Sequence, residues 1–167
     1  GKTPWKNISW GDSMTNTYGG IVDVSRSMYP YRQNLKKGEV VSTLVYGAAF
    51  DETIRFLKTN EKYTNIDKDS IGFGNLGINC NELGYDGTNS VILTGSNDTY
   101  CLNNIYDIVG NVWEWTMEAY DKTKRNYRGG GCKHSGYYFP ISTRGRNPIE
   151  VNQKSSEHGG RIQLYIL

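Results

Sequence analysis

One stretch of the chain, residues 46–58, carries hydrophobic side chains at a helical period. Beginning at Phe50, apolar residues recur at i, i+4 and i+7, and the charged residues fall elsewhere on the helical wheel. This pattern predicts an amphipathic helix from Tyr46 to Lys58. Asp51 and Arg55 stand four residues apart in the favourable order, so we expect an ion pair between them on its exposed face.

Weaker signals predict three further elements near the ends of the chain. Asp12 is a suitable N-cap for a short helix at residues 13–18, and the two glycines at 19–20 would end that helix. Residues 5–10 are predicted to be an extended strand that follows a proline. The alternating pattern of residues 161–167 predicts a closing strand. We expect this closing strand to pair with the N-terminal strand and to bring the two termini together.

The middle of the chain contains one clear strand and one long irregular segment. Residues 59–104 are polar and rich in Asn, Asp, Gly and Ser, which predicts a largely irregular insertion. Four of the five residues at 112–116 are β-branched or aromatic, which predicts a strand; they are Val112, Trp113, Trp115 and Thr116. Because alternate strand residues share a face, Trp113 and Trp115 are expected to form one aromatic slab in the core, with Glu114 on the other face.

Composition limits the class of protein. At 167 residues the chain suits a single domain, 1–167, and the abundance of Gly and Tyr favours short strands and loops over helices. The net charge of +2 gives no indication of nucleic-acid binding. No apolar run approaches about 18 residues, so no membrane insertion is expected. Residues 118–167 carry nine Lys and Arg against four Asp and Glu, which makes this part basic.

The cysteines and histidines predict no metal site. Cys80, Cys101 and Cys132 stand at spacings that match no zinc or redox motif. A disulfide between Cys80 and Cys101 in an oxidising compartment and three unpaired thiols are both open alternatives. The two histidines, His134 and His158, are too few and too distant from a carboxylate cluster to indicate a metal site.

Two glycine-containing motifs in the second half of the chain carry a resemblance to a known family. Residues 104–116 end in GNVWEWT, and residues 128–131 read RGGG. Together they resemble the formylglycine-generating-enzyme (sulfatase-modifying factor) family, a branch of the C-type lectin fold; residues 7–12 and 46–51 are also similar to its elements. The resemblance implies an α+β C-type lectin fold with short strands, two helices, long irregular loops and adjacent termini.

The resemblance also marks where the enzymes of this family do their chemistry. Their segment beginning at RGG carries two cysteines that bind copper; the matching positions here, counted from Arg128, hold His134 and Phe139. Copper(I) needs soft thiolate ligands, and Cys132 is one cysteine displaced from both positions. We therefore expect no enzyme activity. The alternatives are a degenerate or active oxidoreductase of this type and a structural virion or surface-decoration domain.

The segment 128–161 is the expected ligand-binding region. It resembles the C-terminal region of retroelement-diversified variable proteins and of their relatives in phage tails and prophages, where exposed side chains on a lectin frame choose the partner. An ordinary solvated loop is the alternative reading of the same composition. The expected contact residues combine aromatic, amide and charged side chains. They are Cys132, Lys133, His134, Tyr137, Tyr138, Phe139, Arg146, Asn147, Ile149, Glu150, Asn152, Gln153, Lys154, Glu157 and His158.

This resemblance implies a non-catalytic adhesin that displays a recognition surface on a rigid scaffold. The expected partner is a protein or glycan on a cell surface, neither nucleic acid nor lipid, and the basic C-terminal part would favour anionic partners. The implied locations are a phage tail or a bacterial cell surface. A homotrimer or a place within a larger fibre protein is the expected assembly.

Glu114 has two alternative roles. In the enzyme branch the corresponding glutamate holds a structural calcium ion together with backbone carbonyls, and the resemblance implies no other cofactor. Calcium prefers six to eight oxygen ligands, so one carboxylate would need help from carbonyls and water. The alternative is a salt bridge from Glu114 to Arg128 or Arg161. The implied calcium ligands are Val109, Gly110, Val112 and Glu114.

Overall fold

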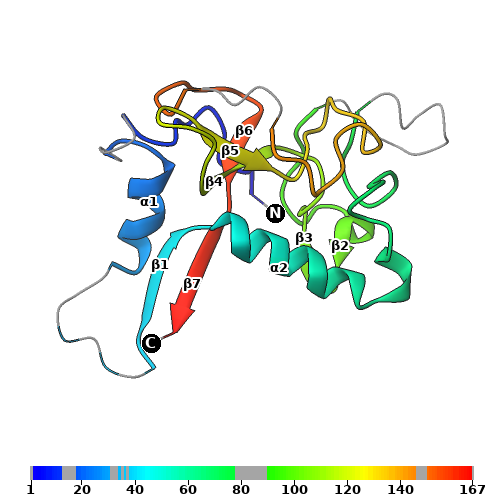
Figure 1. Cartoon of the computed structure of the whole chain (residues 1–167), viewed down its shortest axis with the longest axis horizontal. Coiled ribbons are helices and arrows are strands. Elements are labelled where there is room, and N and C mark those ends of the chain that lie inside the picture. Colours follow the sequence, from blue (N-terminus) through cyan, green and yellow to red (C-terminus); the bar gives the residue numbers. More distant parts are fainter. Residues whose placement is uncertain are drawn as a thin grey trace.

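The computed structural model describes residues 2–12, 18–30, 34, 36, 38–77, 90–145 and 150–166. These residues form a mixed α+β structure with two α-helices, two short 3-10 helices and seven short strands (Figure 1). No helix among the described residues is long and apolar enough to cross a membrane. The helices are α1 (Ile21–Met28), α2 (Gly47–Lys58), η1 (Glu61–Tyr63) and η3 (Asp98–Tyr100).

The described strands form three small sheets. An antiparallel ribbon pairs β1 with β7, a short hairpin pairs β2 with β3, and a three-stranded sheet has the order β5-β4-β6. In this last sheet β4 runs antiparallel to β5 and parallel to β6. The strands are β1 (Val40–Leu44), β2 (Cys101–Leu102), β3 (Ile105–Tyr106), β4 (Trp113–Ala119), β5 (Arg125–Arg128), β6 (His158–Gly160) and β7 (Ile162–Ile166).

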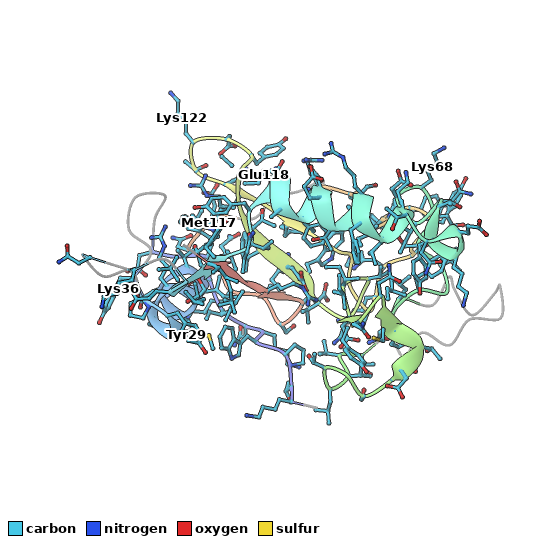
Figure 2. The ribbon with its side chains drawn as sticks, turned by 90° about the horizontal axis from the view of Figure 1, so that it is seen from below. Tyr29, Lys36, Lys68, Met117, Glu118 and Lys122 are labelled. Atoms are coloured by element: carbon cyan, nitrogen blue, oxygen red, sulfur yellow. The ribbon has the colours of Figure 1, made fainter. Side chains whose placement is uncertain are left out.

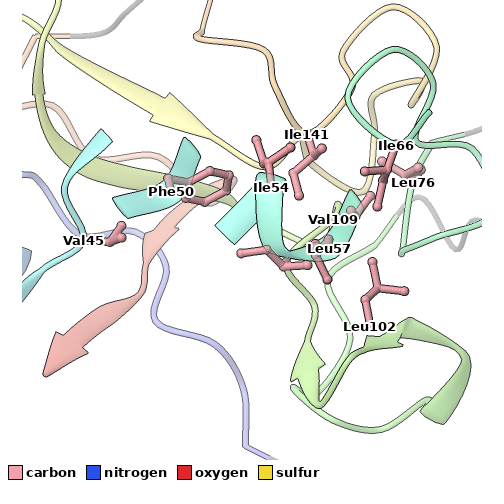
Figure 3. Packing of buried hydrophobic residues seen from close by; sticks show 10 residues of the cluster. Val45, Phe50, Ile54, Leu57, Ile66, Leu76, Leu102, Val109 and Ile141 are labelled. Atoms are coloured by element: carbon pink, nitrogen blue, oxygen red, sulfur yellow. The ribbon is translucent and has the colours of Figure 1, made fainter. Parts of the chain in front are cut away.

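Helix α2 confirms the strongest periodic signal in the sequence. Phe50, Ile54 and Leu57 are buried and form part of a core that also receives side chains from the irregular segments (Figure 3). The predicted ion pair on the exposed face is wrong: Arg55 pairs with Glu52 instead. Asp51 points to two arginines from the C-terminal part of the chain, and this contact is described below.

The first described helix, α1, was not predicted from the sequence. Residues 13–17 are outside the described part of the chain, and α1 begins directly after the two glycines instead of ending at them. Gly20 is the N-cap of α1, and a Cβ there would lie 2.3 Å from the Trp10 carbonyl oxygen. Glycine is therefore needed for close backbone approach at the start of this helix, a role that the sequence cannot distinguish from ending one.

The closing strand predicted at residues 161–167 is confirmed as β7, but the predicted N-terminal strand and its pairing with the closing strand are wrong. Residues 5–10 form no strand, and β7 pairs with β1, with Leu44 opposite Ile162. The N-terminal segment instead donates hydrogen bonds from Asn7 to the Ser155 carbonyl and from Gly11 to the Val151 carbonyl. Figure 1 shows β7 ending at the free tip of its ribbon, away from the N-terminal segment, so the described ends of the chain are not adjacent.

Strand β4 and its aromatic face confirm the prediction for residues 112–116. Trp113 and Trp115 both contact the Tyr127 ring, with centroid distances of 5.0 and 6.1 Å, and they belong to one buried cluster. The insertion predicted at 59–104 is largely irregular where the structure describes it, and residues 78–89 lie outside the described part. In its described parts, 59–77 and 90–104, the helices and strands are limited to η1, η3 and β2.

Candidate functional site

A buried arginine fixes the base of the C-terminal segment. Arg128 is fully buried at 0% exposure; its guanidinium lies 2.6 Å from Asp51 of α2 and 3.3 Å from Glu118 of β4. Arg144 contacts the same two carboxylates from the solvent side. Figure 2 shows Glu118 beside the first turn of α2. Two cations and two anions therefore join α2, β4, β5 and the segment that ends at residue 145.

The segment 131–145 is tied to the core by backbone contacts. The Gly77 amide donates to the His134 carbonyl at 2.9 Å, and the Ser70 amide donates to the Gly136 carbonyl at 3.1 Å. The Ser70 hydroxyl accepts from the Ile141 amide at 2.8 Å. A Cβ on Gly136 would lie 2.8 Å from Ser70 backbone, so this turn fits closely against the core. These contacts hold the loop in one conformation although it contains no helix or strand.

Two tyrosines stand out from this fixed loop. Tyr137 and Tyr138 are 60% and 58% exposed, and their rings meet edge to face with centroids 5.3 Å apart. Elsewhere on the same loop, Lys133 forms an exposed ion pair with Glu157 at 2.8 Å, which raises the pKa of Lys133 and lowers the pKa of Glu157. The ion pair joins the loop to the segment before β6, so both halves of the expected binding region meet here.

His134 and Phe139, to which the sequence resemblance assigns the positions of the two copper cysteines, are neighbours in space. The His134 and Phe139 rings lie 5.3 Å apart, and each contacts the Trp113 ring. The Trp113 indole N–H donates to His134 Nδ1 at 3.2 Å. Burial lowers the pKa of His134 against the opposing effect of Glu157, so the imidazole is neutral near pH 7. An aromatic cluster fills the place where the resemblance implies copper ligands.

Cys132 lies in the interior and not on the expected contact surface. It is a free thiol at 2% exposure, and burial raises its pKa, which disfavours the thiolate. Cys101 is also free. Cys80 lies outside the described residues, but the free Cys101 thiol means that the alternative of a Cys80–Cys101 disulfide is not formed in this structure.

His158 is the second expected contact residue that lies in the interior. It begins β6 opposite Trp113, and its ring packs 4.5 Å from the Tyr127 ring and 5.5 Å from the Trp115 ring. Burial lowers the pKa of His158 to about 4. A neutral, buried imidazole extends the aromatic slab, and sequence spacing gave no signal of this role.

The remaining described contact residues form an edge at residues 150–154, in the segment that precedes β6. Asn152, Gln153 and Lys154 are exposed, and Glu150 is half-buried and lies 3.9 Å from Lys124. Lys124, on the turn between β4 and β5, belongs to this edge and was missed because it precedes the region marked by the motifs. Arg146, Asn147 and Ile149 lie outside the described residues.

The basic character of the C-terminal part does not translate into an open positive surface. Most of its described cations have carboxylate partners, so they neutralise charge within the fold. The expectation that regional charge attracts anionic partners therefore loses its basis. The paired cations are Lys124, Arg128, Lys133, Arg144 and Arg161.

Glu114 forms a salt bridge with Arg161, one of the two alternatives from the sequence. Its two oxygens accept from Arg161 at 2.8 and 3.2 Å, and Arg161 also donates to the Tyr106 carbonyl at 3.0 Å. Burial raises the pKa of Glu114, and Arg161 offsets part of this increase. The described residues contain no group of three or more His, Cys, Asp or Glu side chains suited to a metal.

Of the expected calcium ligands, Val112 and Glu114 line a cavity of about 130 Å³, but Arg161 lines it too and binds both Glu114 oxygens. An ion at Glu114 would have to displace the Arg161 guanidinium, and the Val109 carbonyl lies so close to Gly74 that a Cβ there would be 2.0 Å from the oxygen. The Gly110 amide donates to the Gly129 carbonyl. Calcium at Val109, Gly110, Val112 and Glu114 thus stays a prediction.

Among solved structures, the chain is similar to Treponema denticola variable protein 1, with a TM-score of 0.48 and 17% sequence identity. The similarity covers 77% of this chain and 49% of that one, so this chain spans about half the length of that protein. No protein-family model and no curated protein matches the sequence. The roles of the site residues therefore follow from their own geometry.

Proposed function

We propose that this chain is a non-catalytic ligand-binding domain with a C-type lectin frame, of the variable-protein and phage-adhesin kind. The observation that carries the proposal is the pair of exposed tyrosines, Tyr137 and Tyr138, on a loop whose base is fixed by hydrogen bonds to the core. The binding surface combines these rings with the Lys133–Glu157 ion pair and the edge at residues 150–154.

The physical reason is the low entropy cost of binding through such a loop. A tyrosine offers a large apolar ring and a hydroxyl while only two side-chain torsions must be fixed. Because Gly136 and His134 already hydrogen-bond to the core through their carbonyls, the backbone beneath the rings loses little further freedom on binding. Aromatic anchors on a preorganised backbone are typical of binding hot spots.

The chemistry of the surface favours a protein or glycan partner over a polyanion. Lys133 and Glu157 present opposite charges side by side, so the surface offers directional hydrogen bonds and little net field. Tyrosine rings provide flat faces against which sugar rings or apolar side chains pack. The proposed setting is a phage tail or a bacterial cell surface, as a homotrimer or as part of a larger fibre protein.

The oxidoreductase alternative needs two thiolates for copper(I). The positions that match the family's cysteines hold His134 and Phe139, and Cys132 is buried with a raised pKa. A site of this composition supports binding rather than thiol oxidation.

The test combines binding measurements with the double variant Tyr137→Ala/Tyr138→Ala. The purified domain is applied to an array of bacterial surface glycans and to intact bacterial cells, and the affinity of each bound target is measured by biolayer interferometry. We expect the double variant to weaken binding at least about 30-fold, since each hot-spot aromatic contributes about 1–2 kcal/mol. Its melting temperature should remain within about 2 °C of the wild type, because both rings are exposed.

Phe56→Ala is the matched control, because Phe56 is an exposed aromatic residue on α2. It should leave the affinity unchanged. Equal affinities of the double variant and the wild type would overturn the proposed surface, and so would stoichiometric copper(I) binding that Cys132→Ser removes.

A further inference from the structure

A cavity of about 500 Å³ lies between the end of α1 and the β1–β7 ribbon. Its volume is in the range of small-molecule sites. Arg26 and Pro30 come from the α1 side, and Val41, Thr43 and Tyr165 come from the ribbon. Figure 1 shows this ribbon at the opposite end of the molecule from the β2–β3 hairpin and the loops beside it. The cavity shares none of its lining residues with the surface around Tyr137.

The strand register places one hydroxyl on the cavity's face of the ribbon. Val41 pairs with Tyr165, and Thr43 lies two residues further along β1. Residues opposite each other in an antiparallel pair, and residues two apart on one strand, project from the same face. The Thr43 side chain therefore projects from the face that carries Val41 and Tyr165, both of which line the cavity.

The Thr43 hydroxyl lacks a hydrogen-bond partner. Thr43 is 8% exposed, and its Oγ1 is buried without a donor or acceptor in the described structure. A buried hydroxyl without a partner is unfavourable, so such groups usually meet water or a ligand. The neighbouring Ser42 hydroxyl differs, because it already donates to the Ser25 carbonyl. Thr43 thus offers an unused polar contact beside the cavity.

Two tyrosines form an aromatic wall of the cavity. The Tyr46 and Tyr165 rings meet edge to face with centroids 6.2 Å apart, and both residues line it. Burial, and then the neighbouring Tyr46, raise the pKa of Tyr165, so its hydroxyl stays protonated near neutral pH. With Val41 and Pro30 they make a mostly apolar lining that suits a flat ring.

Arg26 adds a cation at the α1 side of the lining. Within the described part of the chain, Arg26 has no carboxylate partner, in contrast to Arg128, Arg144 and Arg161. A guanidinium binds a carboxylate through two parallel hydrogen bonds. We propose that this cavity binds a small aromatic carboxylate, with Arg26 on the carboxylate, the tyrosines against the ring and the Thr43 hydroxyl on a polar group.

The test uses the whole chain and two probes that differ in charge, 4-methylbenzoate and 4-methylbenzamide. Amide chemical shifts are followed by two-dimensional NMR during titration to millimolar probe. We expect 4-methylbenzoate to shift the signals of Val41, Thr43 and Tyr165, and to bind about tenfold more tightly than 4-methylbenzamide.

Two variants and one control identify the contacts. Arg26→Gln should abolish the preference for the carboxylate probe. With 4-hydroxybenzoate as a further carboxylate probe, Thr43→Val should weaken binding about fivefold without lowering the melting temperature, because it removes a hydroxyl that has no partner in the fold and that the phenolic hydroxyl would meet. Binding of 4-methylbenzoate, which lacks this second polar group, should not change. Arg55→Gln on α2 removes an exposed arginine outside the cavity lining and should change neither probe's affinity.

Three outcomes would overturn this inference. They are equal affinity for the two probes, shifts confined to residues away from the cavity, and no shift at millimolar probe. Retention of the carboxylate preference by Arg26→Gln would likewise remove the assigned role of the guanidinium. Failure here would leave the proposed surface around Tyr137 unaffected, since the two sites share no residue.

Discussion

The two ends of β4 are held by ion-paired clusters of opposite design. Near its C-terminal end the buried hub is a cation: Arg128 lies between Asp51 and Glu118, and Arg144 closes the cluster from the solvent side. Near its start the buried hub is an anion, because Glu114 accepts both of its salt-bridge contacts from Arg161. In the first cluster Arg128 pairs with two carboxylates, whereas in the second Glu114 pairs with one arginine.

This difference separates their roles. The Arg128 cluster joins α2 and two strands to the segment that carries the exposed tyrosines, so it supports the proposed binding surface. The Glu114 pair links β4 to the residue between β6 and β7. A buried charge is tolerated only when its partners compensate for lost hydration. Loss of the cationic hub should therefore be costly, and the pH dependence of stability should differ between the two clusters.

Removal of the buried cation should have the largest effect. Arg128→Met leaves two carboxylates facing each other with only Arg144 between them, and it should lower the free energy of unfolding by about 3 kcal/mol. For a domain of this size the melting temperature should fall by roughly 6–12 °C. Differential scanning calorimetry measures the change. Arg55→Met is the control, because Arg55 forms an exposed pair with Glu52 and should shift the melting temperature by less than about 2 °C.

An equal effect of Arg128→Met and Arg55→Met would contradict the role of Arg128 as a hub. A fall in stability without weaker ligand binding at permissive temperature would show that the cluster stabilises the fold but does not position the tyrosine loop.

The pH dependence of stability should distinguish the two clusters. Burial raises the pKa of Glu114 above its ordinary value of 4.5, although Arg161 opposes this. Its contribution to stability is therefore fully present below pH 4.5 and is lost as the pH rises through the folded-state pKa. Burial also raises the pKa of Asp51, but Arg128 and then Arg144 lower this pKa by more. The pKa of Asp51 therefore lies below its ordinary value of 3.8. Its contribution is present above pH 3.8 and is lost as the pH falls through the folded-state pKa.

Urea unfolding of the wild type, Glu114→Gln and Asp51→Asn across the acidic range measures this contrast. Glu114→Gln, which mimics the protonated side chain, should not lower the free energy of unfolding at neutral pH, because the raised pKa means that folding disfavours the charged form. It should also remove the stabilisation that the wild type gains as the pH falls toward 4.5. Asp51→Asn should remove only the decrease in the free energy of unfolding that the wild type shows below pH 3.8. If the stability of both variants depended on pH in the same way, the opposite pKa shifts of Glu114 and Asp51 would be contradicted.

The sequence predicts the local elements of this fold but not the pairing of distant segments. Helix α2 and strand β4 carry their periodicity within a single window, so their burial patterns were predictable. The partner of β7 was not, because an alternating strand pattern is equally compatible with pairing to residues 5–10 or to β1. Gly20 shows the same limit, since a glycine before a helix and one after it look alike in the sequence.

For the candidate site, a motif marked two positions but not their contact. Counting from Arg128 marked His134 and Phe139, and nothing in the sequence indicated that their rings are in contact. Exposure was not predictable, because Cys132 lies in the interior although its neighbours along the chain are polar. The Arg128–Asp51 pair spans 77 residues and has no local signal. Side-chain direction and long-range charge pairing come only from the fold.

Calcium should have the smallest effect, and it tests whether Glu114 is neutralised by Arg161 or by an ion. Both Glu114 oxygens already accept from Arg161, and the C-terminal end of β4 needs no ion either, because Arg128 has two carboxylates. Millimolar calcium chloride should therefore move the melting temperature by less than about 1 °C relative to magnesium chloride, since an ion that binds weakly shifts unfolding little. An increase in melting temperature that is saturable, specific to calcium and absent in Glu114→Gln would indicate a metal site at Glu114 in place of the salt bridge. Both ends of β4 would then depend on a buried cation.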